Sequence, residues 1–108
     1  MSYACSYEVP ATIEMYREVR RLIGDEPPPG MITHLVVRSG SGLRHVEVWE
    51  SEAACERFRE DRVLPAVHET LRAAGLDAMP PEPVRERLQL VDVQLGSLTP
   101  VHLVEVTD

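Results

Sequence analysis

The side chains best suited to chemistry lie in two neighbouring segments of the chain. His34 lies in residues 31–38, and His45 and Glu47 lie in residues 43–50. Both segments read as β-strands, in which side chains alternate between the two faces. A carboxylate beside a histidine raises the histidine pKa and fixes the tautomer of its ring, as a general base requires. We therefore take His34 as the candidate base and Glu47 as the group that orients it.

The turn between the two strands determines which of these residues face one another. Ser39–Gly42 reads Ser-Gly-Ser-Gly, which is typical of a hairpin turn. A two- or four-residue connection places His34 opposite Glu47, whereas a three-residue turn with a bulge would shift this register. The first register predicts that one face carries the pairs Arg38–Leu43, Val36–His45, His34–Glu47 and Ile32–Trp49, and that the other carries Val37–Arg44, Leu35–Val46, Thr33–Val48 and Met31–Glu50.

The face with His34 also supplies a candidate ligand-binding set. Trp49 offers a flat wall for an aromatic ligand, and Tyr7 joins the set if its strand presents the same face. The full set is Tyr7, His34, Arg38, His45, Glu47 and Trp49.

Two other interpretations of this set stay open. The His34–Glu47 pair is equally compatible with a satisfied polar contact in a dimer interface. His34, His45 and Glu47 are also of the types that hold zinc or iron. Val36, rather than His34, lies directly opposite His45, so we expect no metal and no cofactor.

Composition excludes several classes of protein. The chain has 108 residues and a net charge of −7, with 11 basic residues, all arginine, among 18 acidic ones. This charge repels phosphate backbones and argues against a nucleic-acid partner. We find no signal-peptide pattern and no apolar run long enough to cross a bilayer. Cys5 and Cys55 lie far apart in sequence and fit buried thiols of a reducing compartment, so we expect a cytoplasmic protein with no membrane partner.

The elements that must position these residues follow the order β-α-β-β-α-β. Helix 52–74 is expected to kink at Pro65, and a further strand over 101–106 is expected at the edge of the sheet. The order predicts an α+β fold of the ferredoxin-like βαββαβ type, with an antiparallel sheet and both helices on one face. We expect this domain to span residues 1–95, followed by an extension over 96–108. The expected strands are 3–9, 31–38, 43–50 and 85–95, and the expected helices are 12–23 and 52–74.

The two faces of the predicted sheet differ in composition. The face with Leu35, Val37, Val46 and Val48 is the more uniformly aliphatic, so we expect it to lie beneath the helices. The face with Trp49 would then be left in water as an apolar patch. A second copy packed face to face would cover it, so we expect a homodimer whose two sheets enclose a cavity for a small, partly apolar molecule.

Three stretches of sequence resemble a known group of proteins. One stretch is Val46–Ala53 followed by Phe58-Arg59-Glu60, and the other two are Tyr7-Glu8-Val9 and Pro28-Pro29-Gly30-Met31. They resemble the corresponding segments of small dimeric α+β barrel proteins. These include antibiotic-biosynthesis monooxygenase-type domains and uncharacterised actinobacterial proteins. The resemblance covers residues 3–95 and implies a fold rather than one activity.

The resemblance nevertheless suggests which activities to weigh. Haem-degrading members use an asparagine, a tryptophan and a histidine, and this chain contains no asparagine. Three hypotheses follow. The protein is a homodimer that binds a small molecule without turning it over, a cofactor-free monooxygenase or isomerase acting on an aromatic or polyketide-like substrate, or an interaction module whose dimer interface is filled.

Overall fold

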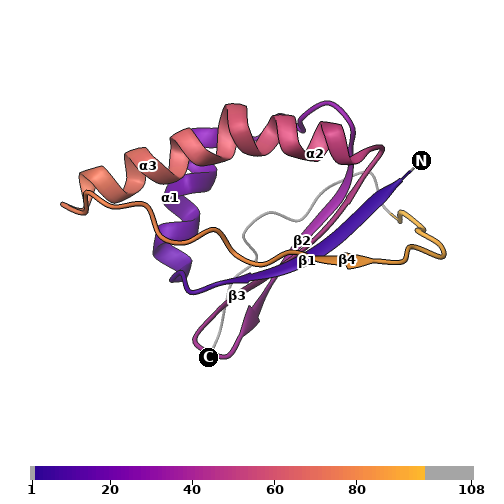
Figure 1. Ribbon diagram of the computed structural model, residues 1–108, viewed down its shortest axis with the longest axis horizontal. Helices are drawn as coiled ribbons and strands as arrows, with labels where there is room; N and C mark the ends of the chain where they lie inside the picture. The colour runs from indigo at the N-terminus through magenta and orange to yellow at the C-terminus, as the bar shows by residue number, and fades with distance from the viewer. Residues whose placement is uncertain (1, 97–108) are drawn as a thin grey trace.

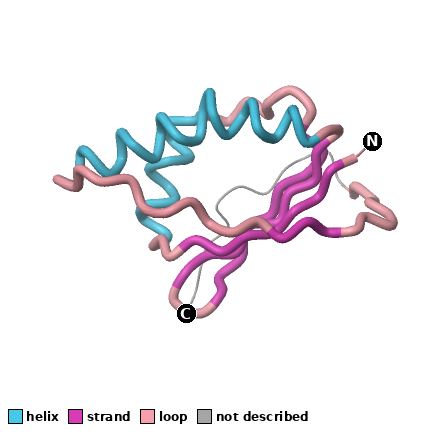
Figure 2. The backbone as a smooth tube through the Cα atoms, viewed as in Figure 1, coloured by secondary structure: helices cyan, strands magenta, loops and turns pink. Residues whose placement is uncertain are grey.

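The protein has two layers, one of helices and one of strands. The computed structural model describes residues 2–96, in which the helices lie together on one side of an antiparallel sheet (Figures 1 and 2). The strand order is β2-β3-β1-β4, and each neighbouring pair is antiparallel. This is the ferredoxin-like arrangement of a split βαβ unit, so the predicted fold class is confirmed. None of the helices in the described range is both long and apolar enough to cross a membrane.

The elements follow the predicted order. The strands are β1 (Tyr3–Val9), β2 (Met31–Ser39), β3 (Gly42–Trp49) and β4 (Glu86–Leu88), and the helical segments are α1 (Ile13–Ile23), α2 (Glu52–Phe58), η1 (Arg59–Val63) and α3 (Leu64–Ala73). A side-chain hydrogen bond caps the N-terminus of each of the two helical regions. The Thr12 hydroxyl accepts a hydrogen bond from the Met15 amide at 3.1 Å, and the Ser51 hydroxyl accepts one from the Ala54 amide at 3.1 Å.

The register of the hairpin is the one that a two-residue turn predicts. Ser39 pairs with Gly42, His34 with Glu47, and Val36 with His45. The prediction fails only at the far end of β2, where the register shifts between Met31 and Thr33. Met31, not the expected Ile32, therefore lies opposite Trp49, and this bulge brings Met31 against the hydrophobic core.

The second helical region is one helical run with a widened turn in its middle. A five-residue π-helix, η1, joins α2 to α3 immediately before Pro65. Proline has no amide hydrogen and its ring crowds the carbonyl four residues earlier. A π turn accommodates such a mismatch without ending the helix, so the predicted kink takes this form.

The helices cover the face of the sheet that the sequence analysis assigned to a partner. Trp49 is fully buried and its ring lies 5.5 Å from that of Phe58 in α2. The core cluster joins Tyr3, Cys5 and Trp49 of this face to Ala54 and Cys55 of α2. On the opposite face, Leu35 and Val37 are 56% and 48% exposed. The expectation that the aliphatic face meets the helices is therefore wrong.

The physical reason lies in side-chain volume and polar pairing. The helix-covered face carries the tryptophan and two tyrosines of the sheet, which bury more apolar area than valines do. Its histidines and glutamate are hydrogen-bonded within the face, so their burial leaves no polar atom without a partner among the described residues.

The fourth strand is shorter than the sequence indicates. Only Glu86–Leu88 pairs with β1, whereas residues 85–95 were expected to form a strand. Val91 and Leu95 beyond it are 93% and 61% exposed. An edge strand has a partner on one side only, so pairing ends where side chains no longer pack. The strand expected at 101–106 lies outside the described residues.

Candidate functional site

Glu47 is the centre of a buried polar cluster on the helix-covered face of the sheet. Its side chain is 6% exposed. The Tyr7 hydroxyl donates a hydrogen bond to Oε2 at 2.6 Å, and the Trp49 indole N–H donates to Oε1 at 2.9 Å. The Cys55 thiol lies 3.8 Å from Oε1. Donors from β1, from β3 itself and from α2 thus hold the carboxylate in one orientation.

Two histidines complete this cluster beside the glutamate. His34 Nε2 lies 3.0 Å from His45 Nδ1 and 3.7 Å from Glu47 Oε2. The first distance is that of a hydrogen bond, whereas the second is an ion-pair separation. The sequence paired His34 with Glu47 as base and orienting group, and the structure shows that the direct hydrogen-bond partner of His34 is His45. The cluster consists of Tyr7, His34, His45, Glu47 and Trp49.

Aromatic contacts fix the plane of the His45 ring. Tyr7 pairs with His45 across β1 and β3, and their rings stack at 4.7 Å with an interplanar angle of 8°. Tyr16 of α1 meets the same ring edge-on at 5.7 Å. The sequence left open whether Tyr7 shares the face of His45, and the register of β1 against β3 places it there.

Burial holds both histidines in the neutral form. Desolvation, helped by the nearby His34, lowers the pKa of His45 to about 4. Desolvation also lowers the pKa of His34, although Glu47 opposes the shift. The sequence predicted a raised pKa for His34 from its glutamate neighbour alone, and burial beneath the helices reverses that direction. The same burial, together with Glu47, raises the pKa of Tyr7, so its hydroxyl remains a donor.

His34 connects the cluster with the surface. It lies on β2, an edge strand, and its side chain is 21% exposed, against 6% for Glu47. Arg38 is exposed further along the same strand, opposite Leu43 near the hairpin. Of the six residues predicted to bind a ligand, the contacts above join five and leave Arg38 at the periphery.

The residues of the cluster do not lie at a surface that a partner could cover, as the expected cavity between two sheets requires. They lie beneath α1 and α2 of their own chain, as the contacts with Tyr16, Cys55 and Phe58 show. No residue of α1 is fully buried, although one side of the helix carries Met15, Tyr16, Val19 and Ile23. The apolar side of α1 is therefore only half covered where it passes over the histidines.

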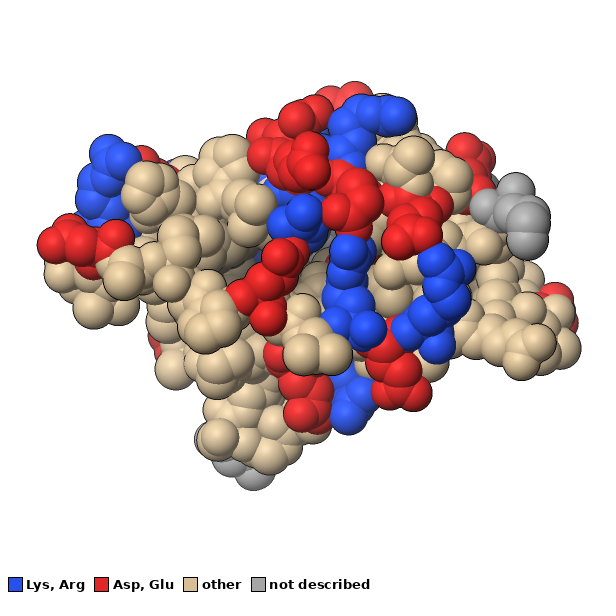
Figure 3. Space-filling view, viewed as in Figure 1, with Lys and Arg blue, Asp and Glu red and all other residues tan. Residues whose placement is uncertain are grey.

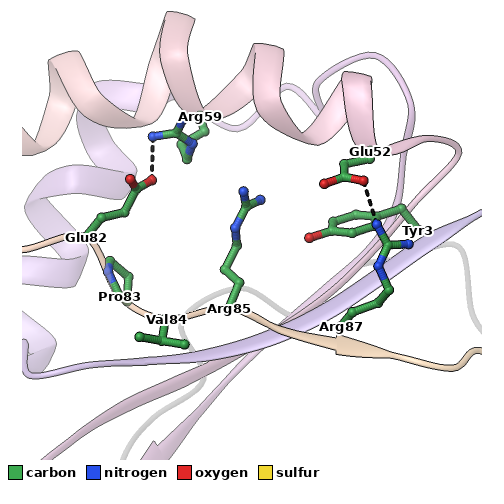
Figure 4. Close-up of a pocket in the computed structure, with 8 residues that line it drawn as sticks. All are labelled: Tyr3, Glu52, Arg59, Glu82, Pro83, Val84, Arg85 and Arg87. Atoms are coloured by element: carbon green, nitrogen blue, oxygen red, sulfur yellow. Dashed lines mark hydrogen bonds and ion pairs between the residues drawn. The ribbon is translucent and has the colours of Figure 1, made fainter.

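A second polar region lies on the other side of α2. A pocket of about 500 Å³ opens between α2 and the segment that leads into β4, and charged side chains gather across it (Figures 3 and 4). Its arginines are already ion-paired. Arg59 lies 2.5 Å from Glu82, Arg87 lies 2.6 Å from Glu52, and Arg85 contacts Glu56. The lining residues are Tyr3, Glu52, Arg59, Glu82, Pro83, Val84, Arg85 and Arg87.

This charged pocket touches the polar cluster through one sulfur atom. Arg85 Nη1 lies 3.4 Å from Cys55 Sγ, whose thiol approaches Glu47 on its other side. The sequence analysis missed Arg85, because nothing in the spacing of the chain relates residue 85 to residue 55. Cys5 and Cys55 are both buried free thiols, as expected.

Comparisons with known proteins give a structural likeness only. No family model matches the chain, and no curated protein matches its sequence. A solved structure from Chloroflexus aurantiacus J-10-fl, which carries the provisional name antibiotic biosynthesis monooxygenase, resembles this chain with a TM-score of 0.49 and 17% identity. The match covers 86% of this chain and 98% of the other.

Proposed function

We propose that the protein binds a small, partly apolar molecule between α1 and the β2–β3 hairpin, with the polar end of the molecule at His34. The observation that carries this proposal is the one-sided exposure of the polar cluster. Glu47 and Trp49 are buried, whereas His34 remains 21% exposed at the edge of the sheet. A buried polar group that opens to solvent at one point beside apolar surface is the usual composition of a small-molecule site.

The residues around His34 offer contacts for both the apolar part and the polar part of such a ligand. Val36, two residues further along β2 on the same face as His34, is half-buried and offers apolar surface. Tyr16 reaches His45 from α1, and Arg20 is near enough to act on the charge of His34. A ligand with an aromatic body and one hydroxyl group would find a partner for each part.

Fluorescence of the single tryptophan provides the test. The Trp49 indole is hydrogen-bonded to Glu47, which lies 3.7 Å from His34. A ligand at His34 should therefore change the surroundings of the indole. We expect 1-naphthol to change Trp49 emission and to raise the melting temperature. Naphthalene, which lacks the hydroxyl, should need a concentration at least about tenfold higher for the same effects. His34→Ala should abolish the difference between the two compounds, whereas His68→Ala, an exposed histidine on α3, should preserve it.

Two results would count against this proposal. If naphthol and naphthalene shift the melting temperature equally, the hydroxyl has no partner at the site. If His34→Ala leaves the preference for naphthol unchanged, the polar end of the ligand lies elsewhere on the protein.

A second candidate function is acid–base chemistry on the bound molecule. His34, which is partly exposed, contacts both His45 and the buried Glu47, and Tyr7 contacts Glu47 in turn, at distances of 2.6–3.7 Å. Such an arrangement can accept a proton from an enolisable or phenolic ligand, which is the first step of a cofactor-free monooxygenase or isomerase. Exchange of an acidic C–H of the ligand with deuterium from solvent, lost in His34→Ala, is the expected sign of this activity.

The exposed part of the sheet face opposite the helices supports the homodimer, whereas Ala4 and Val48 on the same face are buried. Leu35 and Val37 are exposed there at 56% and 48%, and Val46 lies beside Leu35 on β3. Aliphatic side chains in adjacent positions of a sheet form a patch suited to an identical patch on a second copy. The dimer proposed here therefore uses the face opposite to the one that the sequence analysis assigned to it.

A further inference from the structure

We infer that His34, His45 and Glu47 together bind a divalent transition metal ion, with zinc as the best fit. One ligand atom from each residue lies within 4.8 Å of the other two. The three residues come from two adjacent strands and share the helix-covered face. This inference does not depend on the small-molecule site, because the ion would be held by the protein alone.

The distances match those that a zinc ion would impose. Zinc lies about 2.0–2.2 Å from nitrogen and carboxylate oxygen ligands, and a tetrahedral site therefore separates neighbouring ligand atoms by about 3.3 Å. His34 Nε2 is 3.0 Å from His45 Nδ1 and 3.7 Å from Glu47 Oε2. Both values lie within half an ångström of that spacing, and the ligand atoms of the third pair, His45 and Glu47, lie within 4.8 Å of each other.

Residues outside the ligand set hold two of the ligands in place. Tyr7 and Trp49 each donate to one oxygen of Glu47, at 2.6 and 2.9 Å. The Tyr7 ring also stacks on His45 at 4.7 Å. Groups that orient metal ligands in this way are a regular part of protein metal sites. Each carboxylate oxygen keeps a lone pair beyond its donor, so these bonds do not prevent coordination.

Three protein ligands leave at least one position for a further ligand. Sites of two histidines and one carboxylate hold zinc or iron with an open position, unlike structural zinc sites with four protein ligands. The side chain of His34 is 21% exposed, against 6% for Glu47, so the site is nearest to solvent at this histidine.

A neighbouring set is a weaker candidate for the same ion. Cys5, Glu47 and Cys55 also have ligand atoms within 4.8 Å of one another. Cys5 and Cys55 are only 0% and 4% exposed, whereas the side chain of His34 is 21% exposed. The histidine set is the more accessible to an ion from solvent and is the favoured site.

Cobalt and zinc binding to the chelator-treated full chain tests the inference. We expect one Zn²⁺ per chain by isothermal titration calorimetry. We also expect Co²⁺ to give visible bands of a four- or five-coordinate ion without the near-ultraviolet band of a cobalt–thiolate bond. Co²⁺ at this site would quench Trp49 emission, because the indole is bonded to the ligand Glu47.

Matched variants locate the ion. His34→Ala should weaken Zn²⁺ binding by at least about a hundredfold, and Tyr7→Phe, which removes only the hydroxyl bonded to Glu47, by about tenfold. His68→Ala, at an exposed position of α3, should bind as the wild type does. Retained near-ultraviolet circular dichroism checks that each variant is folded. For the wild type, a rise in melting temperature with added Zn²⁺ gives a second measure of binding, which does not depend on whether any variant folds.

Several outcomes would overturn the inference. These are the absence of stoichiometric Zn²⁺ binding by the wild type, a cobalt–thiolate band, or wild-type affinity in His34→Ala. We run the naphthol experiment on chelator-treated protein as well, so that its failure leaves the metal site standing, and the failure of metal binding leaves the naphthol result standing.

Discussion

Glu47 shows how a buried carboxylate is stabilised in this protein by hydrogen bonds rather than by a fixed cation. Tyr7 and Trp49 donate to its two oxygens, and His34 lies 3.7 Å away in the neutral form. A buried acceptor that loses its donors costs more than the bonds themselves contribute. The residues around Glu47 therefore depend on one another, and substitutions among them should not be additive.

Replacement of this carboxylate by an amide should destabilise the fold. In Glu47→Gln, the amide NH₂ must face either the Tyr7 hydroxyl or the Trp49 N–H, and two donors then meet. We expect a loss of about 1–3 kcal/mol in the free energy of unfolding. Urea denaturation followed by Trp49 emission measures it. Glu69→Gln, at an exposed position of α3, should change the free energy by less than about 0.5 kcal/mol, and equal losses in both variants would contradict the assignment.

His45 should make stability depend on pH between neutrality and pH 4. Its folded pKa of about 4 lies below the value of about 6.5 expected in the unfolded chain, so the unfolded state binds the proton first. The contribution is complete above pH 6.5 and is lost as pH falls toward 4, by up to about 3 kcal/mol. The groups that face this ring are His34, Glu47, Tyr7 and Tyr16.

The measurement is the free energy of unfolding of chelator-treated protein at pH 7.0 and 5.0. We expect His45→Gln to lose less stability over this interval than the wild type does, whereas His68→Gln should follow the wild type. A wild-type stability that stays constant from pH 7.0 to 5.0 would show that His45 is not held neutral.

At the scale of elements, the close packing of α2 against the sheet depends on a glycine. Gly30 has φ of +87° and lies just before the bulge of β2, where its carbonyl accepts a hydrogen bond from the Glu50 amide at 2.8 Å. A Cβ at this position would lie 2.6 Å from Cβ of Ala54 in α2. The close approach of α2 to this turn thus requires a residue without a side chain.

Two glycine substitutions separate strain from collision. Gly75 has φ of +82°, and a Cβ there would meet nothing within 4 Å. Gly75→Ala should therefore cost only the backbone strain, about 1–2 kcal/mol. Gly30→Ala carries a similar strain together with the collision against Ala54, so we expect a melting temperature well below that of Gly75→Ala. Equal melting temperatures would show that α2 moves away freely.

At the scale of the whole molecule, one face of the sheet is covered by helices and the other carries exposed Leu35 and Val37. The helical layer explains the first face, and we propose a second copy for the other. If the second copy binds only the folded chain, dilution should lower the melting temperature. This dependence distinguishes a dimer from a monomer with an apolar patch.

A charge within this exposed aliphatic patch should separate the copies. We expect Leu35→Glu to halve the mass found by light scattering and to remove the concentration dependence of the melting temperature. Leu76→Glu places the same charge at another exposed leucine, 51% accessible and just after α3, and should keep the wild-type mass. A wild type that remains monomeric at high protein concentration would contradict the homodimer.

The sequence by itself determined the order of the elements and which residues share a face. Alternation along each strand has a period of two, so His45, Glu47 and Trp49 share one face of their strand. A two- or four-residue turn adds His34 to that face, whereas a three-residue turn with a bulge does not, and the structure has the two-residue turn. The register failed only at the bulge beside Met31. The shortness of β4 was also hidden, because an edge strand ends where packing ends rather than at a sequence signal.

Only the tertiary structure decided which face the helices cover. Alternation treats both faces alike, and both carry apolar residues. The choice depends on the volume of Trp49, Tyr3 and Tyr7 and on whether the polar groups beside them can satisfy one another once water is removed. Those are properties of contacts among β1, β2, β3 and α2. The same burial lowers the pKa of His34, which its glutamate neighbour was expected to raise.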